Sequence, residues 1–186
     1  MTENTVTKEL FEVVKNANPL DSIAYARKIQ VLVALYHEGG RQEDLLAAIN
    51  AKDYFVNHFI DNKFGGVYQS VDANGERDNA SKKTLAQAYA IAALADFVKV
   101  VKDESVLAIA QNIYHTIEKN VWCEECGSYV KGRERDWSVP ESTCAAKGGC
   151  KSVQNAVYDA YCKLYSVWPH AILKCSIIKA FGAIVK

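Results

Sequence analysis

Residues 85–95 read LAQAYAIAALA, and Gln87 is the one polar residue among them. A helix that is apolar all round has to be buried on nearly every side. The stretch therefore predicts an inner helix over residues 85–100 that the rest of the protein encloses.

The segment that follows has the opposite character. Asp103 is placed to cap a helix over residues 103–119, and the apolar residues of that helix fall on one stripe: Leu107, Ala110, Ile113, Tyr114 and Ile117. A single stripe is typical of an outer helix that covers a neighbour. The same order recurs twice, with inner helices expected at 23–36 and 153–167 and outer helices at 45–59 and 171–184. Residues 4–16 predict a short leading helix.

The links between the helix pairs also repeat. FGGVY at 64–68 follows the first pair and CGSYV at 126–130 follows the second, so that Gly66 and Gly127 lie 61 positions apart. One helix pair per repeat predicts stacked helical hairpins. The alternation of buried inner and striped outer helices then predicts an all-α fold, an α/α toroid arc around a central cavity. DANG at 72–75 predicts the tight turn of a small hairpin loop at the mouth of that cavity.

The length sets the extent of the arc. With one helix pair in about 61 residues, the 186 residues hold about three pairs, or half of a six-pair ring. We expect one partial barrel domain over residues 1–186 with open flanks. The final helix is more apolar than an outer helix needs to be, through Ile172, Leu173, Ile177, Ile178, Phe181 and Ile184. Such a surface predicts a homodimer through the flanks or poor solubility.

The composition excludes some classes of partner. Twenty-two basic residues balance 22 acidic ones, which argues against nucleic acid, because that partner requires a basic excess. The polar N-terminus lacks the order of a signal peptide, and no apolar run reaches membrane-spanning length. We therefore expect a cytoplasmic protein with no membrane partner.

Six cysteines leave one alternative open. Four of them could hold zinc, although the second spacing is loose: Cys123, Cys126, Cys144 and Cys150. Motif matches of this kind give false positives, so we expect reduced thiols and neither metal nor cofactor. Cys162 and Cys175 fall in helices, where a thiol acts as a small apolar residue.

Several motifs together resemble one known family, that of N-acylglucosamine 2-epimerase and cellobiose 2-epimerase. They are FGGVYQSVDANG at 64–75, KTLAQAYA at 83–90, YAR at 25–27, DWS at 136–138, KS at 151–152, DAY at 159–161 and LYSVWP at 164–169. The resemblance covers nearly all of this chain but only the N-terminal half of the family's domain. It implies half of an (α/α)6 barrel, a truncated member of a family that inverts C2 of a sugar, or isomerises aldose to ketose, without a metal.

The resemblance also implies a site. The chemistry removes and returns a proton beside a carbonyl, so it needs acid/base groups and a cation for the enediolate oxygen. Arg27 matches the family's arginine for that cation, and the alternative is an arginine paired with a carboxylate. On the third inner helix Asp159 stands for an acidic residue of the family, and either Gln154 or Asn155 stands for its asparagine; we assign Asn155 and Asp159 to substrate binding.

Three further residues are candidate sugar contacts. Gln87 either points into the cavity or is a satisfied polar residue between helices. Tyr68 and Trp137 fall on loops, where an aromatic ring either stacks on a sugar or packs over a helix end.

The histidines complicate the assignment. The third inner helix carries none, and the resemblance implies that the family's other catalytic histidines belong to the half that is absent. We expect the four histidines present to be surface or capping residues: His37, His58, His115 and His170. Two functions therefore stay open, a carbohydrate 2-epimerase or isomerase acting on a mono- or disaccharide, and a catalytically inactive remnant that binds sugar or another protein.

Overall fold

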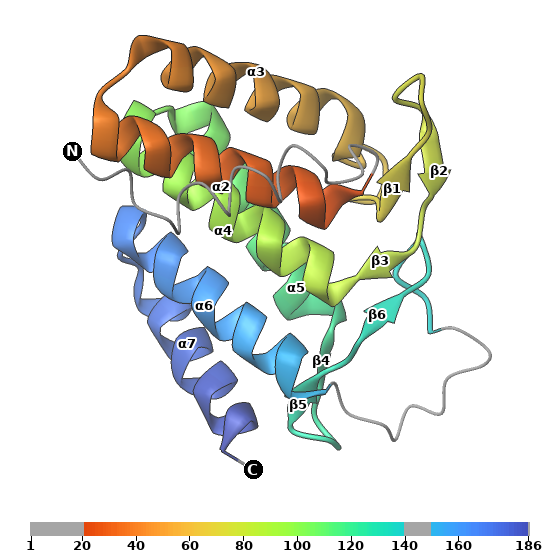
Figure 1. The fold of residues 1–186 in the computed structure, drawn as a ribbon. Coiled ribbons are helices and arrows are strands. Elements are labelled where there is room, and N and C mark those ends of the chain that lie inside the picture. The colour runs from red at the N-terminus through yellow and green to blue at the C-terminus, as the bar shows by residue number, and fades with distance from the viewer. Residues whose placement is uncertain (1–20, 140–149, 186) are drawn as a thin grey trace.

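Three helical hairpins make up the part of the chain that the computed structural model describes, residues 21–139 and 150–185 (Figure 1). Their helices are α2 (Ser22–Gly39) with α3 (Gln42–Phe59), α4 (Thr84–Val101) with α5 (Glu104–Asn120), and α6 (Lys151–Val167) with α7 (Ala171–Ile184). The leading helix expected at 4–16 lies outside the described residues.

The hairpins form two layers. Helices α2, α4 and α6 pack side by side with α4 in the middle, while α3 packs on α2, α5 on α4 and α7 on α6 (Figure 1). Helix α4 buries twelve residues and α5 buries six. This confirms the predicted arc of inner and outer helices. By length and composition α4 could cross a membrane, but 67% of it is buried inside the protein, as expected of a core helix.

The helix ends follow from their sequences. The Asp103 carboxylate accepts hydrogen bonds from the amides of Ser105 (2.9 Å) and Val106 (3.3 Å), which confirms it as the cap of α5. Asp21 caps α2 in the same way. Helix α2 ends at Gly39 and is capped by Gly40, whose φ of 65° lies in the left-handed region that favours glycine.

Short strands lie at one end of the arc. They pair antiparallel as β1 (Ser70–Val71) with β2 (Arg77–Asn79), β3 (Lys82–Lys83) with β6 (Gly132–Arg133), and β4 (Trp122–Cys123) with β5 (Ser128–Tyr129). The β1–β2 pair encloses residues 72–75 and confirms the predicted hairpin. All six strands lie in the segments 60–83 and 121–139, where an outer helix passes to the next inner helix; we call this the loop end of the arc (Figure 1).

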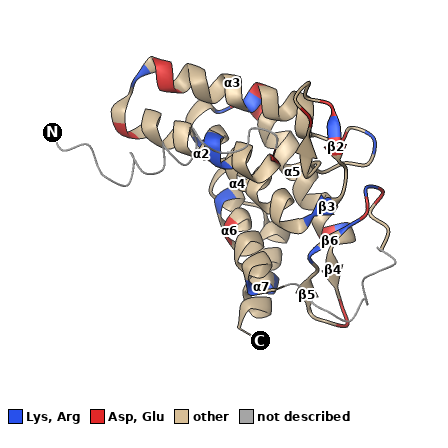
Figure 2. Cartoon of the chain, turned by 45° about the vertical axis from the view of Figure 1, so that its right-hand side comes forward, with Lys and Arg blue, Asp and Glu red and all other residues tan. Residues whose placement is uncertain are grey.

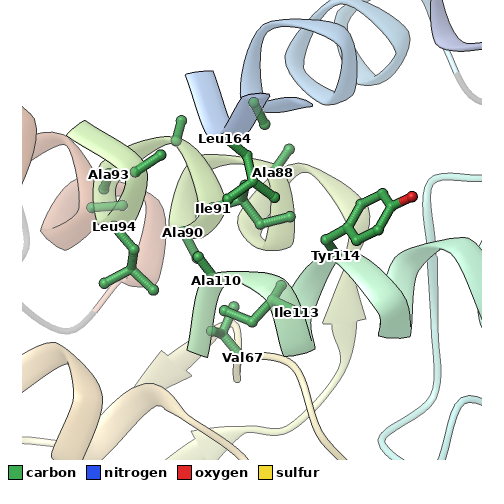
Figure 3. Close-up of a cluster of buried hydrophobic side chains, with 14 of the residues drawn as sticks. Val67, Ala88, Ala90, Ile91, Ala93, Leu94, Ala110, Ile113, Tyr114 and Leu164 are labelled. Atoms are coloured by element: carbon green, nitrogen blue, oxygen red, sulfur yellow. The ribbon is translucent and has the colours of Figure 1, made fainter. Parts of the chain in front are cut away.

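The core is continuous between the layers. Figure 3 shows Ile91 of α4 and Leu164 of α6 directed into the same cluster as Ala110 and Ile113 of α5, with Val67 entering from the loop end. All five are at most 2% exposed. Helix α4 is rich in alanine, so its neighbours approach it closely, and this explains how one helix is covered on nearly every side.

Candidate functional site on the concave face

Arg27 lies exposed on α2 and is held by the neighbouring inner helix. Its Nη2 donates a hydrogen bond of 2.8 Å to the hydroxyl of Tyr89, and its Cζ lies 4.8 Å from the centroid of the Tyr89 ring. No carboxylate among the described residues pairs with Arg27. The guanidinium is therefore oriented by a neutral partner and keeps its charge available, which favours the functional interpretation over the carboxylate-paired one.

A hollow of about 240 Å³ opens beside Tyr89, between α4 and α6. Its lining residues are Ala88, Tyr89, Ala92, Ser152, Asn155, Ala156 and Asp159. Asn155 and Asp159 are exposed and stand one helical turn apart, so they share a face of α6. Arg27, Tyr89, Asn155 and Asp159 thus come from three inner helices to one surface, which we call the concave site.

An ion pair further along the inner helices holds this surface in shape. The Asp96 carboxylate on α4 accepts hydrogen bonds from Gln30 Nε2 of α2 and Lys163 Nζ of α6, both at 2.7 Å. Because one carboxylate bridges both neighbouring helices, it fixes their spacing across the concave face. The sequence analysis did not single out Asp96 or Tyr89. The signal that could have identified them is a polar group inside an otherwise apolar helix.

Gln87 lies beneath the surface. It is fully buried, and its amide bonds both backbone groups of Val67: Oε1 accepts from the Val67 amide at 2.7 Å, and Nε2 donates to the Val67 carbonyl at 2.8 Å. Both sides of the amide are used within the fold. This favours the satisfied polar residue between elements, and we leave Gln87 out of the concave site.

Tyr68 and Trp137 pack at the loop end. The Tyr68 hydroxyl accepts a hydrogen bond from Arg135 Nη2 at 3.3 Å, and Trp137 Nε1 donates to the Phe64 carbonyl at 2.8 Å. Neither ring lines the hollow of the concave site. Both aromatic side chains thus bond within the loops, which favours packing over a helix end, and neither ring lies in the concave site with Arg27.

A buried carboxylate organises the same loops. Asp61, 1% exposed, accepts hydrogen bonds from Lys82 Nζ (2.9 Å) and Arg135 Nε (3.1 Å), and Lys82 is itself fully buried. Burial alone would raise the pKa of Asp61, but the two cations outweigh it and hold that pKa well below its ordinary value. Burial lowers the pKa of Lys82. Figure 2 shows further Lys and Arg residues gathered on β2, β3 and β6 at this end.

None of the four histidines lines the concave hollow. His37 lies in the last turn of α2, and His58 Nδ1 lies 3.0 Å from the Gly75 carbonyl oxygen. His170 caps α7 by accepting from the Ile172 amide at 3.3 Å, and His115 is exposed on α5. His37, His115 and His170 thus take the surface and capping positions that the sequence predicts, whereas His58 is half-buried against Gly75.

The cysteines of the zinc alternative are only partly described. Cys123 Sγ accepts a hydrogen bond from the Cys126 amide at 3.4 Å in the β4–β5 turn, and Cys150 is exposed just before α6. Cys144 lies outside the described residues. Within residues 21–139 and 150–185, no three His, Cys, Asp or Glu side chains gather closely enough to hold a metal.

Known proteins resemble this chain in sequence and fold. A cellobiose 2-epimerase of Bacteroides fragilis is 28% identical over 166 residues, which are 87% of this chain and 42% of that protein. One of Ruminococcus albus is 30% identical over 148 residues, 77% of this chain and 38% of that protein. The chain thus spans less than half the length of these curated relatives. The solved cellobiose 2-epimerase of Bacillus thermoamylovorans shares the fold, with a TM-score of 0.81 at 21% identity over 96% of this chain and 55% of that one.

The family model for N-acylglucosamine 2-epimerase (GlcNAc 2-epimerase) matches residues 13–146, which is well over half of the chain. That match includes the inner helices α2 and α4, and with them Arg27 and Tyr89. On this evidence the chain belongs to the N-acylglucosamine 2-epimerase family.

Proposed function

We propose that the concave site binds a mono- or disaccharide. We also propose that the chain acts as a carbohydrate 2-epimerase or isomerase, which moves a proton at C2 of the sugar. The observation that carries the proposal is the Arg27 guanidinium, held by Tyr89 beside the hollow that Asn155 and Asp159 line. The names of the relatives support a sugar with a free reducing end, such as cellobiose. We take residues 1–186 as one partial α/α-barrel domain of a cytoplasmic protein.

The residues divide the chemistry in a simple way. Removing the C2 proton builds negative charge on the neighbouring oxygen, and a fixed guanidinium stabilises that charge at any physiological pH. Tyr89 orients the guanidinium through its hydroxyl. Asn155 offers both donors and acceptors to sugar hydroxyls, and Asp159 accepts from them.

One observation supports the second candidate function. Proton transfer at C2 needs acid/base groups poised near neutral pH, and no histidine lines the hollow. A chain with Arg27, Asn155 and Asp159 alone would bind the sugar and exchange its proton slowly. Under this alternative it is a non-catalytic sugar-binding or protein-interaction module.

We also propose a second copy of this chain as partner. Helix α7 exposes Ile172, Ile178 and Phe181 by 52–64%, and the Phe181 ring lies 5.8 Å from the ring of Tyr158 on α6. The apolar surface therefore crosses from the outer to the inner helix of the third hairpin. A matching arc is the partner that supplies helices with the same packing geometry.

The decisive experiment is proton exchange. Cellobiose, mannose and N-acetylglucosamine are incubated with the protein in deuterated water, and deuterium at C2 is followed by NMR. We expect incorporation with at least one sugar, and its loss in Arg27→Met. Arg77→Met, which removes an exposed arginine of β2, is the matched control. Sugar binding without exchange would instead establish the non-catalytic alternative, and neither binding nor exchange would overturn both.

A further inference from the structure

A second and larger depression lies on the convex side of the arc. It has a volume of about 610 Å³ and is lined by residues of the segment 60–66, by residues of α5 and by Asp136 and Trp137. It shares no residue with the hollow of the concave site. The volume falls within the range of small-molecule sites, about 300–1,000 Å³. We call it the convex groove.

The wall of the groove is rigid. Gly65 and Gly66 have φ values of 75° and 71°, and a Cβ on Gly66 would come within 2.7 Å of Trp137 Cζ2. Trp137 itself has a φ of 70° and is fixed by its hydrogen bond to the Phe64 carbonyl. A non-glycine residue keeps a left-handed backbone only where its surroundings enforce it. The groove is therefore preformed, which lowers the entropic cost of binding.

A network of ion pairs reinforces that wall. Asp61 binds Arg135 of the Trp137 loop and Lys82 of β3 at the same time, and the Lys82 Nζ lies 5.6 Å from the centroid of the Trp137 ring. Lys82 and Arg135 together thus more than balance the negative charge of the Asp61 carboxylate. It does not give the groove a negative charge, although it is among the lining residues.

Exposed polar side chains also line the groove. The side-chain amides of Asn62 and Asn112 are exposed and make no hydrogen bond with any other described residue. Lys119 is exposed as well and faces the same groove as Asp136, of opposite charge. Amides that both donate and accept, a partly exposed indole and a single lysine opposed by Asp136 suit a neutral polyhydroxylated ligand. A phosphate or another strong anion would require several lining cations, whereas Lys119 is the one Lys or Arg among the residues that line the groove.

We infer that the convex groove is a second carbohydrate-binding site, with Asn62 and Asn112 binding the hydroxyls of a neutral short oligosaccharide against Trp137. The site is separate from the concave site and does not depend on proton transfer there. The protein would then hold a glycan chain in the convex groove while the concave site, under the function proposed above, binds a reducing end.

Titration calorimetry with cellobiose and cellotetraose tests the inference. The double variant Asn62→Ala/Asn112→Ala removes the two amides and leaves Trp137 and the glycines in place. The matched control is Asn50→Ala/Asn57→Ala, which removes two exposed amides of α3. A third variant, Asn155→Ala/Asp159→Ala, disables the concave site. Circular dichroism and Tm confirm that each variant folds.

Binding of cellotetraose at the groove should persist in the concave variant and in the control, and weaken by about tenfold in the groove variant, because two hydrogen bonds are lost. This result holds whether or not the concave site is active. Equal affinity in the groove variant and wild type, or binding that disappears with the concave variant alone, overturns the inference. Absence of oligosaccharide binding in the wild-type protein overturns it too.

Discussion

Gln87 and Val67 are joined by two hydrogen bonds, one to the amide and one to the carbonyl of Val67, at a point where neither residue is exposed. The next repeat contains the same pair of hydrogen bonds from a glutamine side chain to one loop residue. Gln154 on α6 accepts from the Tyr129 amide at 3.0 Å and donates to the Tyr129 carbonyl at 2.7 Å. Each glutamine is the fourth residue of its inner helix. The repeat therefore fixes each loop to the next inner helix with a glutamine side chain.

Replacing Gln87 by leucine should lower the free energy of unfolding by about 3 kcal/mol, because two buried backbone groups of Val67 lose their partners at about 1–3 kcal/mol each. Gln154→Leu should do the same at Tyr129. Urea unfolding measures both. The control is Gln111→Leu on α5, where the side chain is half-exposed and makes no hydrogen bond with other described residues. Equal stability of the Gln87 and Gln111 variants would contradict the role of the glutamine.

Two glycines separate backbone strain from crowding. Gly40 and Gly66 have φ values of 65° and 71°, but a Cβ meets nothing within 4 Å at Gly40 and lies 2.6 Å from Gln87 Oε1 at Gly66. Gly40→Ala should cost about 1 kcal/mol for the left-handed backbone alone. Gly66→Ala should cost about 3 kcal/mol, because crowding adds about 1–3 kcal/mol. Thermal unfolding of the two variants side by side tests this, and similar losses of Tm would refute it.

The carboxylate of Asp61 should make stability depend on acid. Its folded pKa lies below the ordinary value of 3.8. The contribution to stability is thus fully present above about pH 5 and is lost as the pH falls below about 4. Asp61→Asn should cost about 3 kcal/mol at pH 7, since it leaves buried Lys82 without its anion.

The pH dependence of unfolding gives a second test with the Asp61→Asn variant. The difference in unfolding free energy between wild type and Asp61→Asn should shrink between pH 5 and pH 3. Asp53→Asn on α3 is the control, because an exposed ion pair such as that of Asp53 with Lys52 contributes little. A difference that stays constant with pH would show that the carboxylate charge is not what matters.

The flank formed by α6 and α7 should govern association. We expect sedimentation at micromolar concentration to show a dimer for the wild-type chain and a monomer for Ile178→Lys/Phe181→Lys, because the charges disrupt the apolar surface. Val139→Lys changes a residue that is 52% exposed in the loop after β6 and should leave the dimer intact. A wild-type chain that stays monomeric would show that the flank is not an interface.

The sequence by itself determined the helical framework. Apolar periodicity is local information, so an all-round pattern at 85–95 and a stripe after Asp103 were sufficient to predict an inner and an outer helix. The repeat of glycines and tyrosines at one spacing predicted the stacking of hairpins. Arg27, Asn155 and Asp159 were predicted as site residues because their motifs resemble a known family.

Only the tertiary structure decided which partner each polar residue of the inner helices contacts. Gln87 and Tyr89 are two positions apart on the same helix, and pattern alone cannot distinguish them. The helix turns about 200° over two residues, so Gln87 is directed to Val67 and Tyr89 to Arg27. The position of the Trp137 side chain depends on contacts with Phe64 and Gly66, more than 70 residues away in sequence. Such long-range contacts come from loop packing, and loop packing has no periodic signal in the sequence.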